Sequence, residues 1–306
     1  MNNTNKVSDL EWMQRKERGS LGLLRLLVWL SLFFGRNFAR ILLYPISLYF
    51  MLAATQARRA SRQYLQKALD RPVRWSDIFR HFLYFATVSL DRIYFLNGQT
   101  RLFSATIENE ELLHQTMQQH RGAFLFGAHM GSFEAMRALR HEYSDYSLAL
   151  LMYQDNAQKI GKVMAAINPE LQQEIIPLGN VDSMILVHDA LESGTMIGIL
   201  ADRALQQTQL KNQKFLGKDA AFSESAFRLA AMLHRPVLLM LGLYLGGNRY
   251  KLVFEEIYDF SKTQEDRAQA VETAQKRYVD LLSKYCKQYP YNWFNFYDFW
   301  GTPCKD

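Results

Sequence analysis

From about residue 122 onward, short apolar runs alternate with segments of helical periodicity. The apolar runs have the length of buried strands and are Ala123–Phe126, Leu148–Met152, Glu174–Leu178, Met196–Leu200, Pro236–Leu243 and Tyr250–Glu255. The helical segments between and after them are Ser132–His141, Ala157–Ile167, Val181–Glu192, Ser223–Leu233 and the long Glu265–Gln288. Strands that alternate with helices predict an α/β fold with a mostly parallel central sheet flanked by helices.

Residues 21–53 follow a different pattern, a long apolar stretch interrupted by three arginines. Its two uninterrupted pieces, Leu26–Phe34 and Ile41–Ala54, are both shorter than the roughly 20 residues that a membrane-spanning helix needs. We expect two amphipathic helices, broken near Gly35, that lie in a membrane surface or form a shallow hairpin. A single tilted span and a buried pair of core helices are the alternatives.

Two further helices are predicted before the sheet begins, over Arg58–Asp70 and Ser76–Leu96. The chain therefore divides into a helical, membrane-associating region over 1–97 and an α/β catalytic domain over 98–306.

The charge is unevenly distributed, and this changes the expected partners. The net charge is +6, and the first 60 residues hold nine Lys or Arg against three Asp or Glu, so the whole excess lies in the N-terminal region. A nucleic-acid-binding domain would carry its excess on the folded body, whereas a basic apolar arm suits an anionic membrane surface. The two cysteines are far apart and form no metal-binding pattern, so we expect no metal and a reducing compartment.

The stretch "GAHMGSFEA", Gly127–Ala135, follows the first predicted strand and carries candidate chemistry. Ligands of such sheets bind beyond the carboxyl ends of the strands, where His129 lies. Ser132 is a plausible N-cap, which places Glu134 in the first turn of the next helix, from which it can reach back to His129. A carboxylate that orients an imidazole makes a general base. The alternative is a histidine held structurally by a capping carboxylate.

Several stretches together resemble the lysophospholipid and lipid A acyltransferase superfamily, in its bacterial late-acyltransferase branch. "FLFGAHMGSFEAMRAL" resembles the H-x4-D/E block of that superfamily, and "IGILADRALQQ" resembles its strand followed by Asp. "KFLGKDAAFSESAFRLAAMLHRPVLLM" is similar to its F-x-G-x-x-A-x-[FT] block with the next helix and strand. "ERGS", "RRASRQYL" and the C-terminal "YPYNWFNFYDFWG" look most like acyltransferases of aryl-polyene lipid pathways.

The resemblance implies transfer of an acyl chain from a thioester to a lipid hydroxyl, with His129 as general base and Glu134 as its partner. No cofactor is implied. The residues expected to stabilise the oxyanion or bind substrate are Gly131, Ser132, Asn156, Asp202, Arg203, Phe215, Gly217 and Phe222. For Asp202 and Arg203 the alternative is a structural ion pair or loop anchor, and for the two phenylalanines it is ordinary core packing.

The chain departs from the lipid A enzymes at two places. "MYQDNAQK" contains Asn156 but lacks the arginine that these relatives place there, and "GLYLGG" has Tyr244 where they often have another. The departure favours a less anionic acceptor, or a polyene-carrying headgroup, over lipid A itself. Three lysines after Asp202, namely Lys211, Lys214 and Lys218, could meet an acidic acyl carrier protein, or form a solvated loop.

We therefore expect an O-acyltransferase on the cytoplasmic face of the bacterial inner membrane. Its donor would be an acyl carrier protein thioester, with acyl-coenzyme A second, and its acceptor a lipid. A lipid thioesterase or hydrolase that uses the same histidine with water is one alternative. A catalytically silent membrane subunit of a lipid-assembly complex is another. The C-terminal "YNWFNFYDFW" is either an interfacial or acyl-lining belt or a segment packed on the domain.

Overall fold

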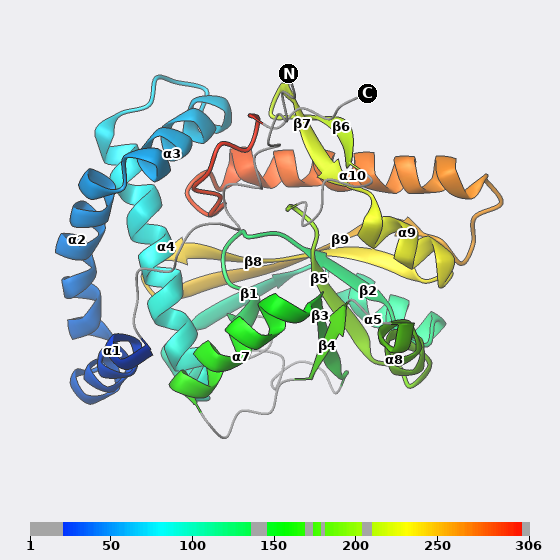
Figure 1. Ribbon diagram of the computed structural model, residues 1–306, viewed down its shortest axis with the longest axis horizontal. Helices are drawn as coiled ribbons and strands as arrows, with labels where there is room; N and C mark the ends of the chain where they lie inside the picture. The colour runs from blue at the N-terminus through cyan, green and yellow to red at the C-terminus, as the bar shows by residue number, and fades with distance from the viewer. Residues whose placement is uncertain (1–20, 136–145, 169–173, 179–180, 204–209, 302–306) are drawn as a thin grey trace, which may run out of the picture.

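The computed structural model describes residues 21–135, 146–168, 174–178, 181–203 and 210–301. A seven-stranded sheet forms its centre (Figure 1). In spatial order the strands are β1 (Ser104–Glu108), β9 (Arg249–Asp259), β8 (Pro236–Gly246), β2 (Phe124–Gly127), β5 (Met196–Leu200), β3 (Leu148–Tyr153) and β4 (Ile175–Leu178). Every neighbouring pair is parallel except β8 and β9, so the predicted mostly parallel sheet is confirmed.

Helices cover both faces of the sheet. Successive strand side chains point to opposite faces, so they are buried in two separate clusters, one on each face. One cluster takes Phe124 and Phe126 of β2 together with side chains of α8 (Val181–Glu192), α9 (Ser225–Met232) and α10 (Arg267–Gln288). The other takes Leu125 together with side chains of α4 (Trp75–Leu96), α5 (Glu110–Gln119) and α7 (Gln154–Ile167). The continuous apolar runs in the sequence thus reflect strands buried on both sides.

The N-terminal region is helical, as expected, and breaks where expected. Helix α1 (Leu21–Phe34) ends at Gly35, whose φ of 79° is open to glycine at no steric cost, and α2 (Arg36–Ala53) follows it. With α3 (Thr55–Ala68) and α4, these helices stand together beside one end of the sheet (Figure 1). Among the described residues no single helix is long and apolar enough to cross a membrane, although α2 and α3, bent by 96°, together meet that criterion.

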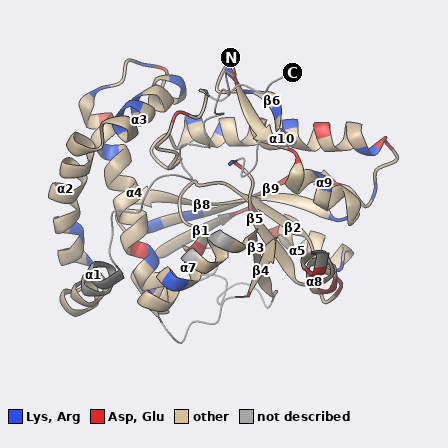
Figure 2. Ribbon diagram, in the orientation of Figure 1, with Lys and Arg blue, Asp and Glu red and all other residues tan. Residues whose placement is uncertain are grey.

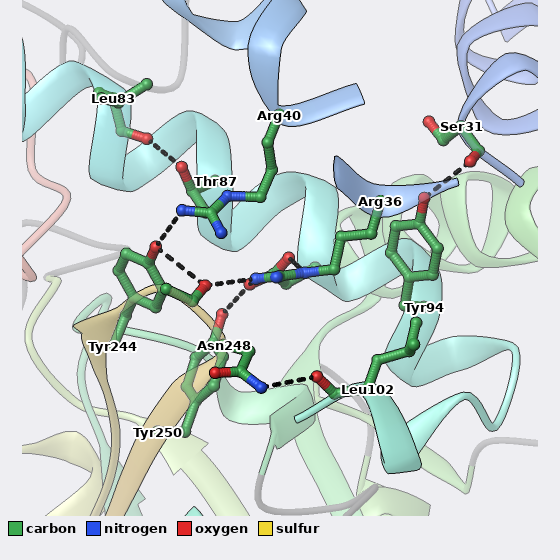
Figure 3. A network of polar contacts seen from close by, with 12 residues as sticks. Ser31, Arg36, Arg40, Leu83, Thr87, Tyr94, Leu102, Tyr244, Asn248 and Tyr250 are labelled. Atoms are coloured by element: carbon green, nitrogen blue, oxygen red, sulfur yellow. Dashed lines mark hydrogen bonds and ion pairs between the residues drawn. The ribbon is translucent and has the colours of Figure 1, made fainter. Parts of the chain in front are cut away.

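A buried charge network fixes α2 to the sheet (Figure 3). Arg36 of α2 donates to both carboxylate oxygens of Asp91 in α4, at 2.7 and 2.8 Å, and to the carbonyl of Gly247. Asp91 also accepts from the hydroxyl of Tyr250 at 2.7 Å. Both charged side chains are almost fully buried. Each therefore offsets the cost of removing the other charge from water, a cost that an unpaired buried charge would not recover. The helical region therefore packs directly on the α/β unit.

Three strands and one helix have no counterpart in the sequence prediction. Strand β1 and helix α5 lie in the stretch before residue 122, and β6 (Leu210–Phe215) and β7 (Lys218–Ser223) form an antiparallel hairpin. The hairpin strands are polar, with "LKNQKF" in β6, so they lack the apolar run that marked the others. Gly217 makes their tight turn with a φ of 81°.

Candidate active site

His129 lies in the loop that leaves β2, and Asp202 lies directly beyond the neighbouring strand β5. Because the two strands are parallel neighbours, their carboxyl ends bring these residues together. The Nδ1 atom of His129 is 2.8 Å from Oδ1 of Asp202, and the backbone N–H of His129 donates to Oδ2 at 3.1 Å. The aspartate is fully buried, whereas 30% of the His129 side chain is exposed.

This contact determines the tautomer of the histidine. An ionised carboxylate only accepts hydrogen bonds, so Nδ1 must carry the proton that it donates to Asp202. The lone pair is then on Nε2, the ring atom opposite. A neutral imidazole held in this way is ready to accept a proton at Nε2 from a bound hydroxyl.

The structure brings His129 to Asp202 and not to Glu134, and the expected partnership of His129 with Glu134 stays a prediction. Glu134 turns to α4, where its Oε1 lies 2.8 Å from Nε of Arg92, and its Oε2 accepts from the Ser132 hydroxyl at 3.4 Å. No hydrogen bond joins His129 to Glu134 in the described part of the chain. Between the two residues Gly131 adopts a left-handed φ of 67°.

The electrostatics of the pair favour a neutral imidazole and an ionised carboxylate. Burial lowers the pKa of His129 below its ordinary value of 6.5, against the raising effect of Asp202. Burial alone would raise the pKa of Asp202, but the charge and hydrogen bond of His129, followed by Arg203, lower it well below its ordinary range. The histidine is therefore available as a base at neutral pH.

The two amides expected to stabilise an oxyanion are occupied. The N–H of Gly131 donates to the carbonyl of Asn292 at 2.9 Å, and that of Ser132 donates to the carbonyl of Gly242 at 2.7 Å. The hydroxyl of Ser132 accepts from the N–H of Ala135 at 3.1 Å, which confirms its place as N-cap. These bonds tie the turn to β8 and to the C-terminal segment, and the oxyanion role of the two amides stays a prediction.

Arg203 holds the C-terminal segment against the loop after β5. Its Nε donates to Oδ1 of Asn295 at 2.7 Å, its guanidinium donates to the carbonyl of Phe294, and it lies over the ring of Tyr297. The alternative reading of Arg203 as a loop anchor matches this geometry. Asp202, in contrast, belongs to the centre of the site.

The remaining predicted site residues lie in the aromatic core or in the hairpin turn, or their side chains are outside the described set. Phe215 and Phe222 are fully buried and pack edge-to-face on each other and on the C-terminal aromatic residues, which is core packing. Gly217 forms the hairpin turn. Asn156 falls in α7, but its side chain is outside the described set.

The lysines expected to face a carrier protein belong to the same hairpin. Lys211 forms an ion pair with Glu272 of α10 at 2.7 Å, and Lys214 forms one with Asp219 at 3.1 Å. Lys218 is exposed on β7. The hairpin therefore presents partly neutralised positive charge.

Three residues at the site were not found from the sequence. Trp293 and Asn295 donate to Oδ2 of Asp202 at 3.0 and 2.9 Å, and Arg92 meets Glu134. The predicted packing of the aromatic C-terminal segment on the domain is confirmed, but its sequence pattern does not predict contact with a carboxylate. Such contacts join residues about 90 positions apart, which no local pattern encodes.

Known proteins give one clear match. The model of the bacterial lipid A biosynthesis acyltransferase family matches residues 81–302, which is more than half of the 306-residue chain. The matched range contains His129, Glu134, Asp202 and the C-terminal aromatic segment. A search of curated proteins finds no match. The chain therefore belongs to the bacterial lipid A biosynthesis acyltransferase family and is an acyltransferase.

Proposed function

We propose that the protein transfers a fatty-acyl or polyene acyl chain from an acyl carrier protein thioester to the hydroxyl of a lipid, with His129 as general base. The observation that carries this proposal is the bond from Nδ1 of His129 to Asp202, which leaves Nε2 free to accept a proton. Family membership supports acyl transfer to a lipid. The base and its carboxylate differ from the expected pair only in that Asp202 takes the orienting position.

The reaction follows from this geometry. Nε2 of His129 accepts the proton of the lipid hydroxyl while the oxygen attacks the thioester carbonyl. A carbon–oxygen bond forms, and the tetrahedral intermediate then collapses as the carbon–sulfur bond breaks. The imidazolium, stabilised by Asp202, returns its proton to the departing thiolate. Atoms and charge balance without a cofactor or metal.

We place the reaction at the cytoplasmic face of the inner membrane, because the N-terminal helices suit an anionic lipid surface. Helices α1 and α2 leave large apolar side chains exposed, including Trp29, Phe33, Ile41 and Tyr49, each more than half accessible. No Asp or Glu occurs between residues 21 and 68, whereas seven Lys or Arg do. Figure 2 shows Lys and Arg, but no Asp or Glu, on the described parts of α2 and α3. Such a face suits the membrane interface, where the exposed side chains of Arg59 and Arg62 can meet lipid phosphates, whereas Arg36 stays paired with Asp91.

For the acceptor we propose a class of lipid. It is either a lipid less anionic than lipid A or one that carries a polyene headgroup. Tyr244 stands near the carboxyl end of β8, where an arginine was expected in lipid A enzymes. Arg40 of α2 donates to the hydroxyl of Tyr244 at 3.3 Å (Figure 3). A cation thus reaches this edge from another element, which supports one anionic group on the acceptor rather than several.

The test is lipid analysis of cells that carry the wild type, His129→Ala or His188→Ala at matched protein levels. We expect one acylated lipid to disappear with His129→Ala and its acceptor, lacking that chain, to accumulate. His188 is exposed on α8, so its replacement is the matched control and should change nothing. Unchanged lipids in His129→Ala cells would refute the role of His129 as general base. Recovery of the protein away from the inner membrane fraction would refute the location.

A further inference from the structure

The two oxygens of the Asp202 carboxylate have different partners. Among the described residues, Oδ1 receives one donor, the ring N–H of His129 at 2.8 Å. Oδ2 receives three donors, namely the backbone N–H of His129 at 3.1 Å, the indole N–H of Trp293 at 3.0 Å and the amide of Asn295 at 2.9 Å. A carboxylate with one oxygen saturated in this way cannot rotate, so the other oxygen stays directed at Nδ1.

Asn295 is itself oriented by Arg203. Oδ1 of Asn295 accepts from Nε of Arg203 at 2.7 Å, while Nδ2 donates to Asp202. A guanidinium can only donate, so it fixes which end of the amide is the oxygen. Without it the amide could turn and present its oxygen to the carboxylate, which would repel it.

The backbone around Trp293 is fixed to the catalytic loop as well. Met130 and Trp293 form an antiparallel bridge, and the N–H of Phe294 donates to the carbonyl of His129 at 2.7 Å. The carbonyl of Trp293 lies 2.8 Å from Nε2 of His81 in α4. The indole is fully buried. The donors are therefore held by the same bonds that shape the loop of the base.

From these contacts we infer that Trp293 and Asn295 are positioning residues of the acyl-transfer reaction, which act on His129 through Asp202, with Arg203 orienting Asn295. The inference rests on the proposed role of His129 as base. The C-terminal segment is then part of the active site, although its side chains reach the reacting atoms only through the carboxylate.

The first variant is Trp293→Phe, with Trp300→Phe as its matched control. Trp300 belongs to the same aromatic cluster, with its ring centre 6.2 Å from that of Trp293, but its buried indole N–H has no hydrogen-bond partner among the residues that the structure describes. Both substitutions remove one indole from one cluster. Only the first removes a hydrogen bond to Asp202.

The readout is the titration of His129 by nuclear magnetic resonance in histidine-labelled protein, with the signal assigned by its loss in His129→Ala. A carboxylate that loses a donor attracts the imidazolium more strongly, so Trp293→Phe should raise the pKa of His129 by about 0.5–1. Acyl transfer from acyl carrier protein thioester to extracted membrane lipid should fall about tenfold. Trp300→Phe should leave the titration at the wild-type position.

Equal titrations in the two tryptophan variants would overturn the inference. Circular dichroism shows whether Trp293→Phe is folded. If it is not, Asn295→Ala removes a donor from the same oxygen and must shift the pKa in the same direction. The titration requires no substrate, so it decides the role of the segment even if His129→Ala cells keep their lipids and the proposed function fails.

Discussion

At the scale of single residues, the pH dependence of catalysis follows from the environment of His129. Because burial lowers the pKa of His129 below 6.5, its neutral form predominates at and above pH 6.5 and gives way to the imidazolium only at lower pH. The acidic limb of kcat/KM should therefore have a midpoint below 6.5. Replacing Asp202 by Asn removes the anion that raises this pKa, so the limb should move to lower pH.

The same replacement separates the two carboxylates. An amide at position 202 can offer its own N–H to Nδ1, which places the proton on Nε2 and should lower kcat by about 10³-fold or more. Glu134→Gln disturbs the contact with Arg92 and leaves the hydrogen bonds of the imidazole intact. Whatever rate it retains, its acidic limb should coincide with that of the wild type. A limb that moves with Glu134 and not with Asp202 would restore the pairing expected from the sequence.

At the scale of elements, the turn after β2 depends on a close approach of two backbones. A Cβ on Gly131 would overlap the carbonyl oxygen of Gly242 in β8, and its φ of 67° disfavours any side chain. We expect Gly131→Ala to lower the free energy of unfolding by about 2–4 kcal/mol. The control is Gly161→Ala in the middle of α7, where a Cβ meets nothing within 4 Å and should raise stability by about 0.5–1 kcal/mol.

Denaturant unfolding of both variants measures the two effects, and equal stabilities would show that the β2 turn is not constrained.

The same elements show how much of the fold the sequence predicts. The β5 and α8 boundaries were predicted without error because apolar runs and helical periodicity are local signals. The hairpin of β6 and β7 is not predicted, because its polar strands contain no continuous apolar run. The contact of His129 with Asp202 is not predictable from local sequence, because it depends on the adjacency of β2 and β5, which only the topology reveals.

At the scale of the whole molecule, His81 joins the N-terminal helices to the catalytic segment. Its Nδ1 lies 2.8 Å from the Ser61 hydroxyl of α3 and its Nε2 lies 2.8 Å from the carbonyl of Trp293. The carbonyl can only accept, so Nε2 carries the proton and Nδ1 accepts from Ser61. The ring is fully buried between these partners, and burial lowers the pKa of His81 to about 4.

We expect His81 to make the stability of the folded protein sensitive to acid. The unfolded chain binds a proton at an ordinary histidine pKa of 6.5, whereas the folded chain resists it until about pH 4. Stability is therefore fully present above pH 6.5 and should fall by about 3 kcal/mol as the pH drops to 4. His81→Gln should be less stable at pH 7 but lose less on acidification. Chemical unfolding of both proteins at pH 7, 6, 5 and 4 measures the difference. Parallel curves would mean that His81 takes up its proton while its bonds to α3 and Trp293 persist, so acid would leave the helical region joined to the active site.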